Sequence, residues 1–344
     1  MSGAESSPTT GPELRIDPLS GHRVIIAGAR AGRPGGGLVA PPPEPLRADD
    51  DPFAEGHEDR TPPEVFAVRP GGGPANGPGW IVRVVPNLYP ALTDAGDELP
   101  AEPQEAGRPN READLFWHAP SRGAHEVIIN SPRPVTSLSE LSTEQVVAAV
   151  EVWRQRMRAH PEAACLHLIV NERREAGASR PHTHAQLYAL PFVPAEIARE
   201  RERAGAYTTR TMGGNLLADL LQEEVRKRER IVAIDSEAVV MCPFASQVPF
   251  QLMLVPRTPR ARFEADGPTG AALLHDVLGR LGRRLGASPP LNLWIRTAPQ
   301  GAEHFCWRID VLPRLTHLAG LELGAGVHLN SLAPEDAAAQ LRDA

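Results

Sequence analysis

Two histidines separated by one residue, then a glutamine, stand in the stretch SRPHTHAQLYALP at residues 179–191. In a strand, alternate residues point to the same face, so His182, His184 and Gln186 share one side if this stretch is extended. Three kinds of chemistry fit the pattern. The first is a metal site that needs further ligands, the second a hydrogen-bonded polar pair at a sheet edge, and the third a nucleophilic imidazole beside a phosphate. The pattern alone leaves all three open.

The residues before the histidines favour an anion. The stretch NERREAGAS at 171–179 begins with Asn171 and ends in a Gly-Ala-Ser turn. Such a turn aims backbone N–H groups, and here the Ser179 hydroxyl, at an anion. Gln186 adds a neutral amide donor. An imidazole near pH 7 is mostly unprotonated, and a hydrogen bond at one ring nitrogen exposes the other as a nucleophile for phosphorus. A phosphorylated imidazole stays reactive and passes its group onward.

These residues must be positioned by short strands and a few helices. Loops are expected at the Pro- and Gly-rich stretches 32–52, 69–79 and 100–110, because proline removes a backbone donor and glycine costs backbone entropy. Alternating, β-branched runs predict strands at 22–28, 64–68, 79–87, 125–131, 165–171 and 184–191. Helices are expected at 139–159, with Ser139 and Ser142 as candidate caps, and at 213–230 and 268–286.

A weak internal repeat organises the chain. HEVIINSPRP (125–134) aligns with FQLMLVPRTP (250–259), and CLHLIVN (165–171) aligns with LNLWIRT (291–297). Each half then reaches a strand ending in Leu-Pro, at 184–191 and 306–313, and a helix fills the same interval in both. The shared order predicts an α+β fold of two antiparallel-sheet half-barrels, each backed by helices.

The expected domains are 1–195 and 196–344. Only the first carries the His-x-His-x-Gln, so histidine chemistry is expected at one site per chain.

Composition excludes several classes of protein. The net charge is −7, the bases are mostly arginine, and the sole lysine, Lys227, lies in an acidic helical stretch, so no nucleic-acid surface is expected. No phosphate-binding GxxxxGK[ST] loop and no GxGxxG fingerprint occurs. Three scattered cysteines fit a reducing compartment. With no signal peptide and no apolar run long enough to span a bilayer, a cytoplasmic protein without membrane contact is expected.

Six ordered segments make the sequence resemble the galactose-1-phosphate uridylyltransferase family, the nucleotidyltransferase branch of the histidine-triad superfamily. They are LRIDPLSGHRVIIAGARAGRP (14–34), DPFAEGHEDRTPPEV (51–65), VRVVPNLYPAL (82–92), GAHEVIINSPRP (123–134), NERREAGASRPHTHAQ (171–186) and LPRLTHLAGLELGAGVHLNSLAPEDAA (312–338). The resemblance implies the same duplicated architecture and an enzyme of carbohydrate metabolism, cytoplasmic and dimeric.

The resemblance also implies roles for single residues. His184 matches the nucleophile that takes a nucleoside monophosphate from a nucleotide sugar, Gln186 the amide on the phosphate oxygens, and His182 a support for His184 through its backbone carbonyl. The implied nucleotide and phosphate contacts are Arg30, Arg33, Phe53, Asn87, Tyr89, Asn171, Gly177 and Ser179. Read from the residues alone, Asn87 is equally a turn residue after a strand.

The sequence departs from the family at its metal ligands. The first metal site of the pattern falls on Asp51, Ala54, Pro134 and His182, and neither alanine nor proline coordinates through its side chain. Asp51 and His57 are left as a partial site. The second falls on Glu200 with Arg296, Cys306 and Arg308, and arginines repel a divalent cation. We therefore expect no metal and no other cofactor.

The resemblance leaves the reaction partners open. The leading expectation is nucleotidyl transfer from UDP-glucose to a hexose 1-phosphate, by double displacement through His184. One alternative is a nucleotide-sugar phosphorylase, for example of an ADP-sugar, with inorganic phosphate as acceptor. Another is a metal-free nucleotide-binding protein without turnover. The expected partners are a nucleotide sugar, a sugar 1-phosphate or phosphate, and a second copy of the chain.

Overall fold

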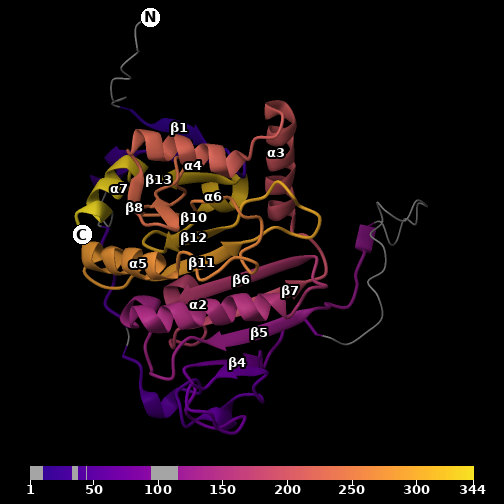
Figure 1. The fold of residues 1–344 in the computed structure, drawn as a ribbon. Helices are drawn as coiled ribbons and strands as arrows, with labels where there is room; N and C mark the ends of the chain where they lie inside the picture. Colours follow the sequence, from indigo (N-terminus) through magenta and orange to yellow (C-terminus); the bar gives the residue numbers. More distant parts are fainter. Residues whose placement is uncertain (1–10, 33–37, 44, 94–114) are drawn as a thin grey trace, which may run out of the picture.

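A long antiparallel sheet forms the body of the protein (Figure 1). The computed structural model describes residues 11–32, 38–43, 45–93 and 115–344. In this part of the chain, one sheet has ten strands, in the spatial order β3 (Phe66–Val68), β4 (Val82–Pro86), β5 (Ala124–Ile129), β7 (His184–Leu190), β6 (Cys165–Glu172), β11 (Leu291–Arg296), β12 (Arg308–Pro313), β10 (Leu252–Pro256), β9 (Ala238–Met241) and β8 (Ile231–Ile234).

The strand order is the same in both halves when it is read outward from the border between β6 and β11. Each half runs through three strands, a helix and two further strands, and the last two strands insert between the third and the border. The helices are α2 (Thr143–Arg158) and α5 (Ala271–Leu285). The fold is a mixed α+β fold, as predicted.

The two halves nevertheless share one sheet, which corrects the expectation of two sheets. Strands β6 and β11 pair antiparallel, with Asn292 opposite Asn171 and Trp294 opposite Ile169. Unpaired edges of long strands expose backbone donors and acceptors, and the pairing removes one such edge from each half.

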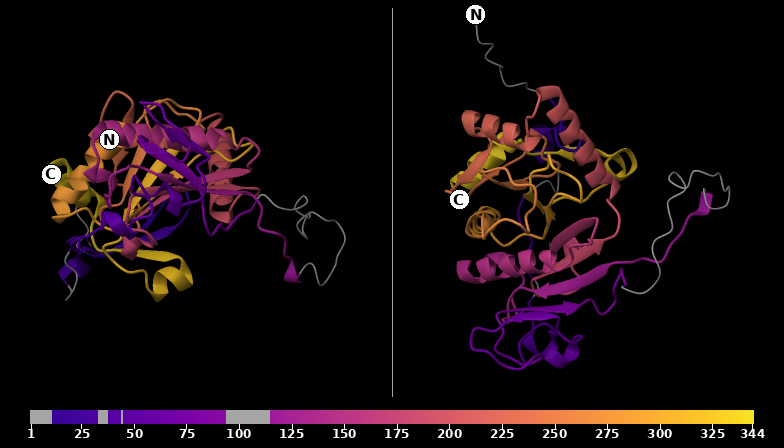
Figure 2. Two further views of the ribbon diagram at one scale, coloured as in Figure 1. Left: turned by 90° about the horizontal axis from the view of Figure 1, so that it is seen from below. Right: turned by 45° about the vertical axis from the view of Figure 1, so that its right-hand side comes forward.

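Helices α2 and α5 lie side by side over one face of the sheet (Figures 1 and 2). The predicted cap is present, since the Ser142 side chain accepts from Gln145 N at 3.2 Å; Ser139 lies instead in the 3-10 helix η4 (Leu138–Glu140). Leu166, Leu168 and Val170 of β6 are buried in the core that α2 covers, whereas His167, Ile169 and Asn171 on the other face of this strand are only half-buried. The helices thus cover one face, and polar side chains gather on the other.

The remaining elements are a second, three-stranded sheet and the other helices. The second sheet joins β1 (Glu13–Ile16), β2 (Arg23–Ile26) and β13 (Val327–Asn330), with β2 and β13 parallel, so strands from the two ends of the described chain pair with one another. The other helices are α3 (Ala195–Thr211), α4 (Leu216–Lys227), α6 (Gly320–Ala325), α7 (Pro334–Arg342) and the 3-10 helices η1 (Gly28–Gly32), η2 (Ala48–Asp50), η3 (Glu58–Arg60) and η5 (Arg174–Ala176). Among the described residues, no helix has the length and apolar character needed to cross a membrane.

A buried carboxyl joins the end of β6 to η4. Glu172 is 1% exposed, its Oε1 accepts from Leu138 N at 2.6 Å, and its Oε2 lies 2.7 Å from the Ser137 hydroxyl. Burial raises the pKa of Glu172 to about 7, although these hydrogen bonds oppose the rise. The folded protein therefore binds this proton more tightly than the unfolded chain does.

This linkage predicts a pH-dependent difference between the wild type and Glu172→Gln. A raised pKa contributes stability that is complete below the unfolded value near 4.5 and is lost as the pH rises through about 7. Glutamine keeps an acceptor and a donor without the charge. Urea unfolding at pH 4.5 and pH 8 should show the variant gaining roughly 3 kcal/mol on the wild type between these values. The exposed variant Glu162→Gln is the control and should show no such gain. A constant difference between wild type and Glu172→Gln would contradict the prediction.

Candidate active site

His184 begins β7, which lies between β5 and β6 and is paired along both edges. Its Nδ1 lies 2.8 Å from the backbone oxygen of His182. Because a carbonyl oxygen only accepts, Nδ1 carries the proton and Nε2 carries the lone pair. Within the described residues, Nε2 has no hydrogen-bond partner, and His184 lines a cavity of about 130 Å³. The ring is only 3% exposed, and burial lowers the pKa of His184 below its usual 6.5.

The same cavity brings together much of the predicted site. Its lining includes the predicted residues Phe53, Asn87, Tyr89, Ser179, His184 and Gln186, together with Arg60, Thr61 and Arg180. The Phe53 ring meets the His184 ring edge-on, with 5.2 Å between centroids. Tyr89 is 84% exposed.

Gln186 and Asn87 are joined by a histidine that sequence reasoning missed. The His125 Nε2 lies 3.0 Å from Gln186 Oε1 and 3.0 Å from Asn87 Nδ2, and the ring stacks on Tyr188. Tyr188 also donates to Gln186 Oε1 at 3.1 Å. With its oxygen so engaged, the Gln186 amide keeps its N–H groups for a ligand. The signal was the cross-strand register, which places β5 beside β7 and which a single motif does not show.

Asn87 also has the turn role left open for it. Its Oδ1 accepts from Tyr89 N at 2.9 Å, just after β4 ends. An asparagine side chain that bonds the backbone two residues on stabilises such a turn. The turn and the contact with His125 together fix this edge of the cavity.

The loop from Asn171 to Ser179 is rigid. Arg173 adopts φ 72° and ψ 158°, a conformation that costs a non-glycine residue about 1–3 kcal/mol. Its guanidinium donates to the backbone oxygens of Pro41 and Pro42 at 2.6 and 3.0 Å. Gly177 follows at φ 87°, and Asn171 Oδ1 accepts from Asn292. The strain is thus held by contacts with a distant segment.

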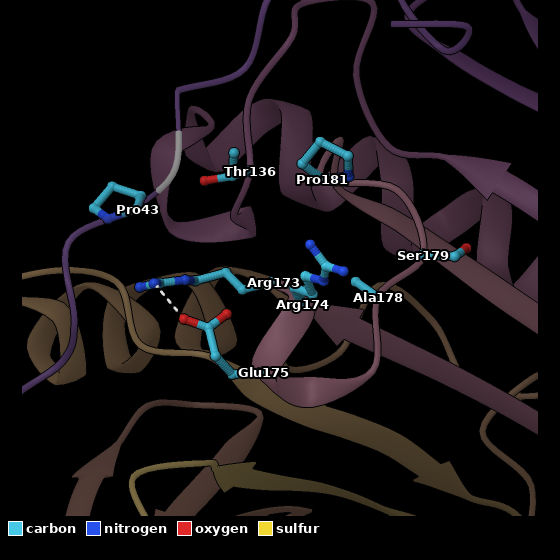
Figure 3. A pocket seen from close by; sticks show the side chains of 8 residues that line it. All are labelled: Pro43, Thr136, Arg173, Arg174, Glu175, Ala178, Ser179 and Pro181. Atoms are coloured by element: carbon cyan, nitrogen blue, oxygen red, sulfur yellow. Dashed lines mark hydrogen bonds and ion pairs between the residues drawn. The ribbon is translucent and has the colours of Figure 1, made fainter.

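A second cavity of about 460 Å³ opens on the other side of this loop (Figure 3). Figure 3 shows Arg173 paired with Glu175 at its floor, with Thr136 and Pro181 opposite. Ser179 lines both cavities. Of the two predicted arginines, Arg30 lies half-exposed in η1 and lines neither cavity, and Arg33 lies outside the described residues.

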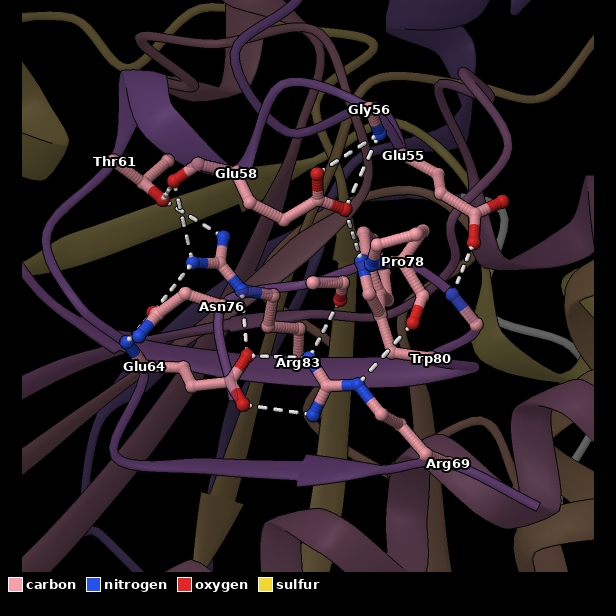
Figure 4. Close-up of polar contacts among 12 residues, drawn as sticks. Glu55, Gly56, Glu58, Thr61, Glu64, Arg69, Asn76, Pro78, Trp80 and Arg83 are labelled. Atoms are coloured by element: carbon pink, nitrogen blue, oxygen red, sulfur yellow. Dashed lines mark hydrogen bonds and ion pairs between the residues drawn. The ribbon is translucent and has the colours of Figure 1, made fainter. Parts of the chain in front are cut away.

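A network of buried charges supports the wall opposite His184 (Figure 4). Arg83 is 1% exposed and donates to Glu64 at 3.0 Å and to Thr61 Oγ1 at 2.7 Å. Trp80 Nε1 donates to Glu58 at 2.7 Å. Arg83 of β4 and Trp80 just before it thereby hold the segment that carries Arg60 and Thr61 to the cavity.

Comparison with known proteins agrees with the resemblance seen in the sequence. The model for "Galactose-1-phosphate uridyl transferase, N-terminal domain" matches residues 80–194, which hold β4 to β7 with both histidines. The chain is 29% identical to ADP-glucose phosphorylase from Arabidopsis thaliana, over 96% of this chain and 93% of that protein. It is 27% identical to a probable galactose-1-phosphate uridylyltransferase from Drosophila melanogaster, over 96% and 95%. The chain is similar to the galactose-1-phosphate uridylyltransferase family over nearly its whole length. It is a nucleotidyltransferase.

A solved structure agrees with this family assignment. An ADP-glucose phosphorylase from Arabidopsis thaliana with bound ADP-glucose superimposes with a TM-score of 0.77 at 26% identity, covering 97% of this chain and 99% of that one.

The family's first metal-ligand positions hold no ligand cluster here. Asp51 and His182 meet directly, Nδ1 to Oδ2 at 2.6 Å. The His57 Nδ1 contacts the backbone oxygen of Asp51 at 2.7 Å. Across the part of the chain that the structure describes, no three His, Cys, Asp or Glu side chains are grouped to bind a metal ion.

The second set of positions forms a buried ion cluster. Arg308 contacts Glu200 at 3.0 Å and Asp310 at 2.9 Å, and Arg296 lies 3.3 Å from Glu200. Cys306, at the remaining position of this set, makes no ion pair with these residues. Its thiol packs in an apolar group and points to Trp307 O. Alternation along β12 puts Asp310, two residues after Arg308, on the same face.

Removing the central cation of this cluster should destabilise the fold. Glu200 and Asp310 are 6% and 3% exposed, so Arg308→Met leaves buried carboxylates with less compensation. We expect a loss of roughly 3–5 kcal/mol in the free energy of unfolding, measured with urea. Arg199→Met, which removes an exposed ion pair one residue from Glu200, should cost less than about 1 kcal/mol. Equal losses in the two variants would disprove a structural role for the cluster.

Burial of His184 predicts an unusual titration. Burial is the main cause that lowers its pKa, so the imidazole stays neutral at pH values where an exposed histidine is half protonated. NMR of ¹⁵N-labelled histidines, assigned by the loss of one signal in His184→Ala, should give a midpoint below 6.5. A midpoint at or above 6.5 would show that burial does not keep the His184 imidazole neutral at mildly acid pH.

Proposed function

We propose that the chain transfers the nucleotide of a nucleoside diphosphate sugar by way of a covalent intermediate on His184. The observation that carries the proposal is the fixed tautomer of His184, with Nδ1 committed to a backbone oxygen and Nε2 facing the cavity. A histidine held in this way is a nucleophile without prior deprotonation.

The reaction has two displacements. The Nε2 lone pair attacks the α-phosphorus, the bond from this phosphorus to the bridging oxygen breaks, and sugar 1-phosphate leaves. An acceptor phosphate oxygen then attacks the same phosphorus, the P–N bond breaks, and His184 returns to its starting form. Gln186 donates from its amide to the non-bridging oxygens, where charge is greatest in the transition state. Asn171, Gly177, Ser179, Arg30 and Arg33 remain predicted phosphate contacts.

Two acceptors are considered. Transfer from UDP-glucose to a hexose 1-phosphate is the leading proposal, supported by the family and by relatives named galactose-1-phosphate uridylyltransferase. A phosphorylase that uses inorganic phosphate and an ADP-sugar is the second, supported by the likeness to ADP-glucose phosphorylase in sequence and structure. A nucleotide-binding protein without turnover is disfavoured because the chain keeps His184, Gln186, Ser179 and Asn171 together.

We also propose that residues 1–195 and 196–344 are two copies of one histidine-triad-like half-barrel. The matching order of strands and helix in the two halves supports this, although the copies now share a sheet. In the second copy, strand β12 carries the Arg308 cluster, whereas the corresponding strand of the first copy, β7, carries His184. A cytoplasmic homodimer remains the prediction for the assembly.

Intact-mass measurement tests the intermediate. After incubation with UDP-glucose, ADP-glucose or a GDP-sugar, the wild type should gain the mass of one nucleoside monophosphate from its true substrate. His184→Ala should gain none, whereas the exposed control His304→Ala should behave like the wild type. An unmodified wild type with all three sugars would refute nucleotidyl transfer.

The loaded protein then reports the acceptor. Discharge by galactose 1-phosphate with formation of a new nucleotide sugar supports the transferase. Discharge by inorganic phosphate with formation of a nucleoside diphosphate supports the phosphorylase and would replace the leading proposal.

A further inference from the structure

Asp51 and His182 form a buried pair directly behind the nucleophile. They are 131 residues apart in sequence, and their side chains are 1% and 0% exposed. The His182 Nδ1 lies 2.6 Å from Asp51 Oδ2, and its Nε2 lies 2.8 Å from the backbone oxygen of Ser131. Both ring nitrogens therefore face oxygen atoms.

This geometry constrains the protons on the ring. The Ser131 carbonyl only accepts, so Nε2 carries a proton, and one further proton is shared between Nδ1 and the Asp51 carboxyl group. Placed on Nδ1, this proton makes His182 an imidazolium and Asp51 its counter-charge. A buried charge needs such a partner, because removal from water is costly for an unpaired ion.

A metal does not fit these residues. Coordination by histidine uses the lone pair of a ring nitrogen, and both His182 nitrogens are occupied by hydrogen bonds. Ala54 and Pro134, at the other family ligand positions, offer no side-chain donor atom. Asp51 and His182 thus lie at two of the positions where the family pattern has metal ligands. Here a direct contact between the two side chains, and not a metal ion, holds the two segments together.

The pair reaches both the cavity wall and the nucleophile. Asp51 Oδ1 accepts from Phe53 N at 3.0 Å, so one carboxylate fixes the Phe53 backbone and the His182 ring. The Phe53 ring in turn contacts the rings of His182 and His184, at 6.1 and 5.2 Å between centroids. The His182 backbone oxygen accepts from His184 Nδ1, so the placement of His182 also sets the orientation of the His184 ring.

We propose that Asp51 is a positioning residue for the nucleophile, and that the Asp51–His182 ion pair replaces a metal ion in ordering the reaction centre. This deepens the proposed function, on which its kinetic test rests.

Single-turnover loading with the nucleotide sugar tests the positioning role. Asp51→Asn keeps the size of the side chain and removes its charge, so the His182 ring loses one donated proton and its fixed orientation. We expect the rate of nucleotide loading to fall about 10- to 100-fold at unchanged final amplitude, the effect of a slightly misplaced reacting group. A role in folding alone would instead lower the amplitude at an unchanged rate and would overturn the proposal. Asp51→Glu should recover part of the rate, and the exposed neighbour variant Asp49→Asn should keep all of it.

A second measurement does not depend on activity. In ¹⁵N-labelled wild type, both ring N–H protons of His182 should be visible and protected from exchange, and Asp51→Asn should lose one. Protein grown with added zinc should contain no stoichiometric zinc by mass spectrometry, and a chelator should leave its spectrum unchanged. One zinc per chain, or a wild-type His182 with a single N–H, would overturn the proposal. If the wild type loads no nucleotide, the proposed function fails, while these spectra still decide whether the ion pair exists.

Discussion

The hydrogen bond from His184 Nδ1 to the backbone oxygen of His182 is the constraint on which the rest of the site depends. It is available because His182 lies just before β7, so its carbonyl is not used in the strand ladder. Thr183, between the two, is held on both sides, by Val135 O and by Asn130 N. The backbone next to the carbonyl that orients the nucleophile is therefore hydrogen-bonded on both sides, although it lies just outside β7.

The sheet supplies chemistry on one face because the helices cover the other. Buried leucines and valines of β6 and β7 pack under α2, and the alternate positions carry His184, Gln186 and Tyr188. The same alternation on β12 places Arg308 and Asp310 on one face of the second half. Strands β7 and β12, which hold corresponding places in the strand order, thus carry a nucleophile in one half and an ion cluster in the other.

Local pattern predicted most of the elements. Six predicted strands and three predicted helices are present, because alternation and helical spacing are properties of neighbouring residues. Helix α3 was missed because its ARERERAG run is strongly charged and shows little apolar periodicity. The short strands β8 and β9 were missed because four apolar residues do not define a period.

Contacts between distant residues account for the remaining errors. Sequence reasoning named six residues of the His184 cavity through family resemblance, but it did not name Asp310 as a partner of Arg308. It weighed Asp51 as a metal ligand, since nothing in a linear pattern shows that Ser131 O occupies the second nitrogen of His182. His125 was missed for the same reason, since its partners lie 38 and 61 residues away.

The border between β6 and β11 also has a consequence for folding. Neither half alone protects the edge of its sheet at the border. The border strands β6 and β11 lie in the middle of the ten-stranded sheet and carry apolar residues on their covered face. A chain interrupted between α3 and α4 would present two long unprotected edges, the arrangement that leads to aggregation. Pairing across the border joins residues more than 100 positions apart, so loop closure precedes the last contacts and slows folding. An ancestral single unit of this kind would have needed a second copy to cover the same edge, and covalent linkage of two units makes that pairing independent of concentration.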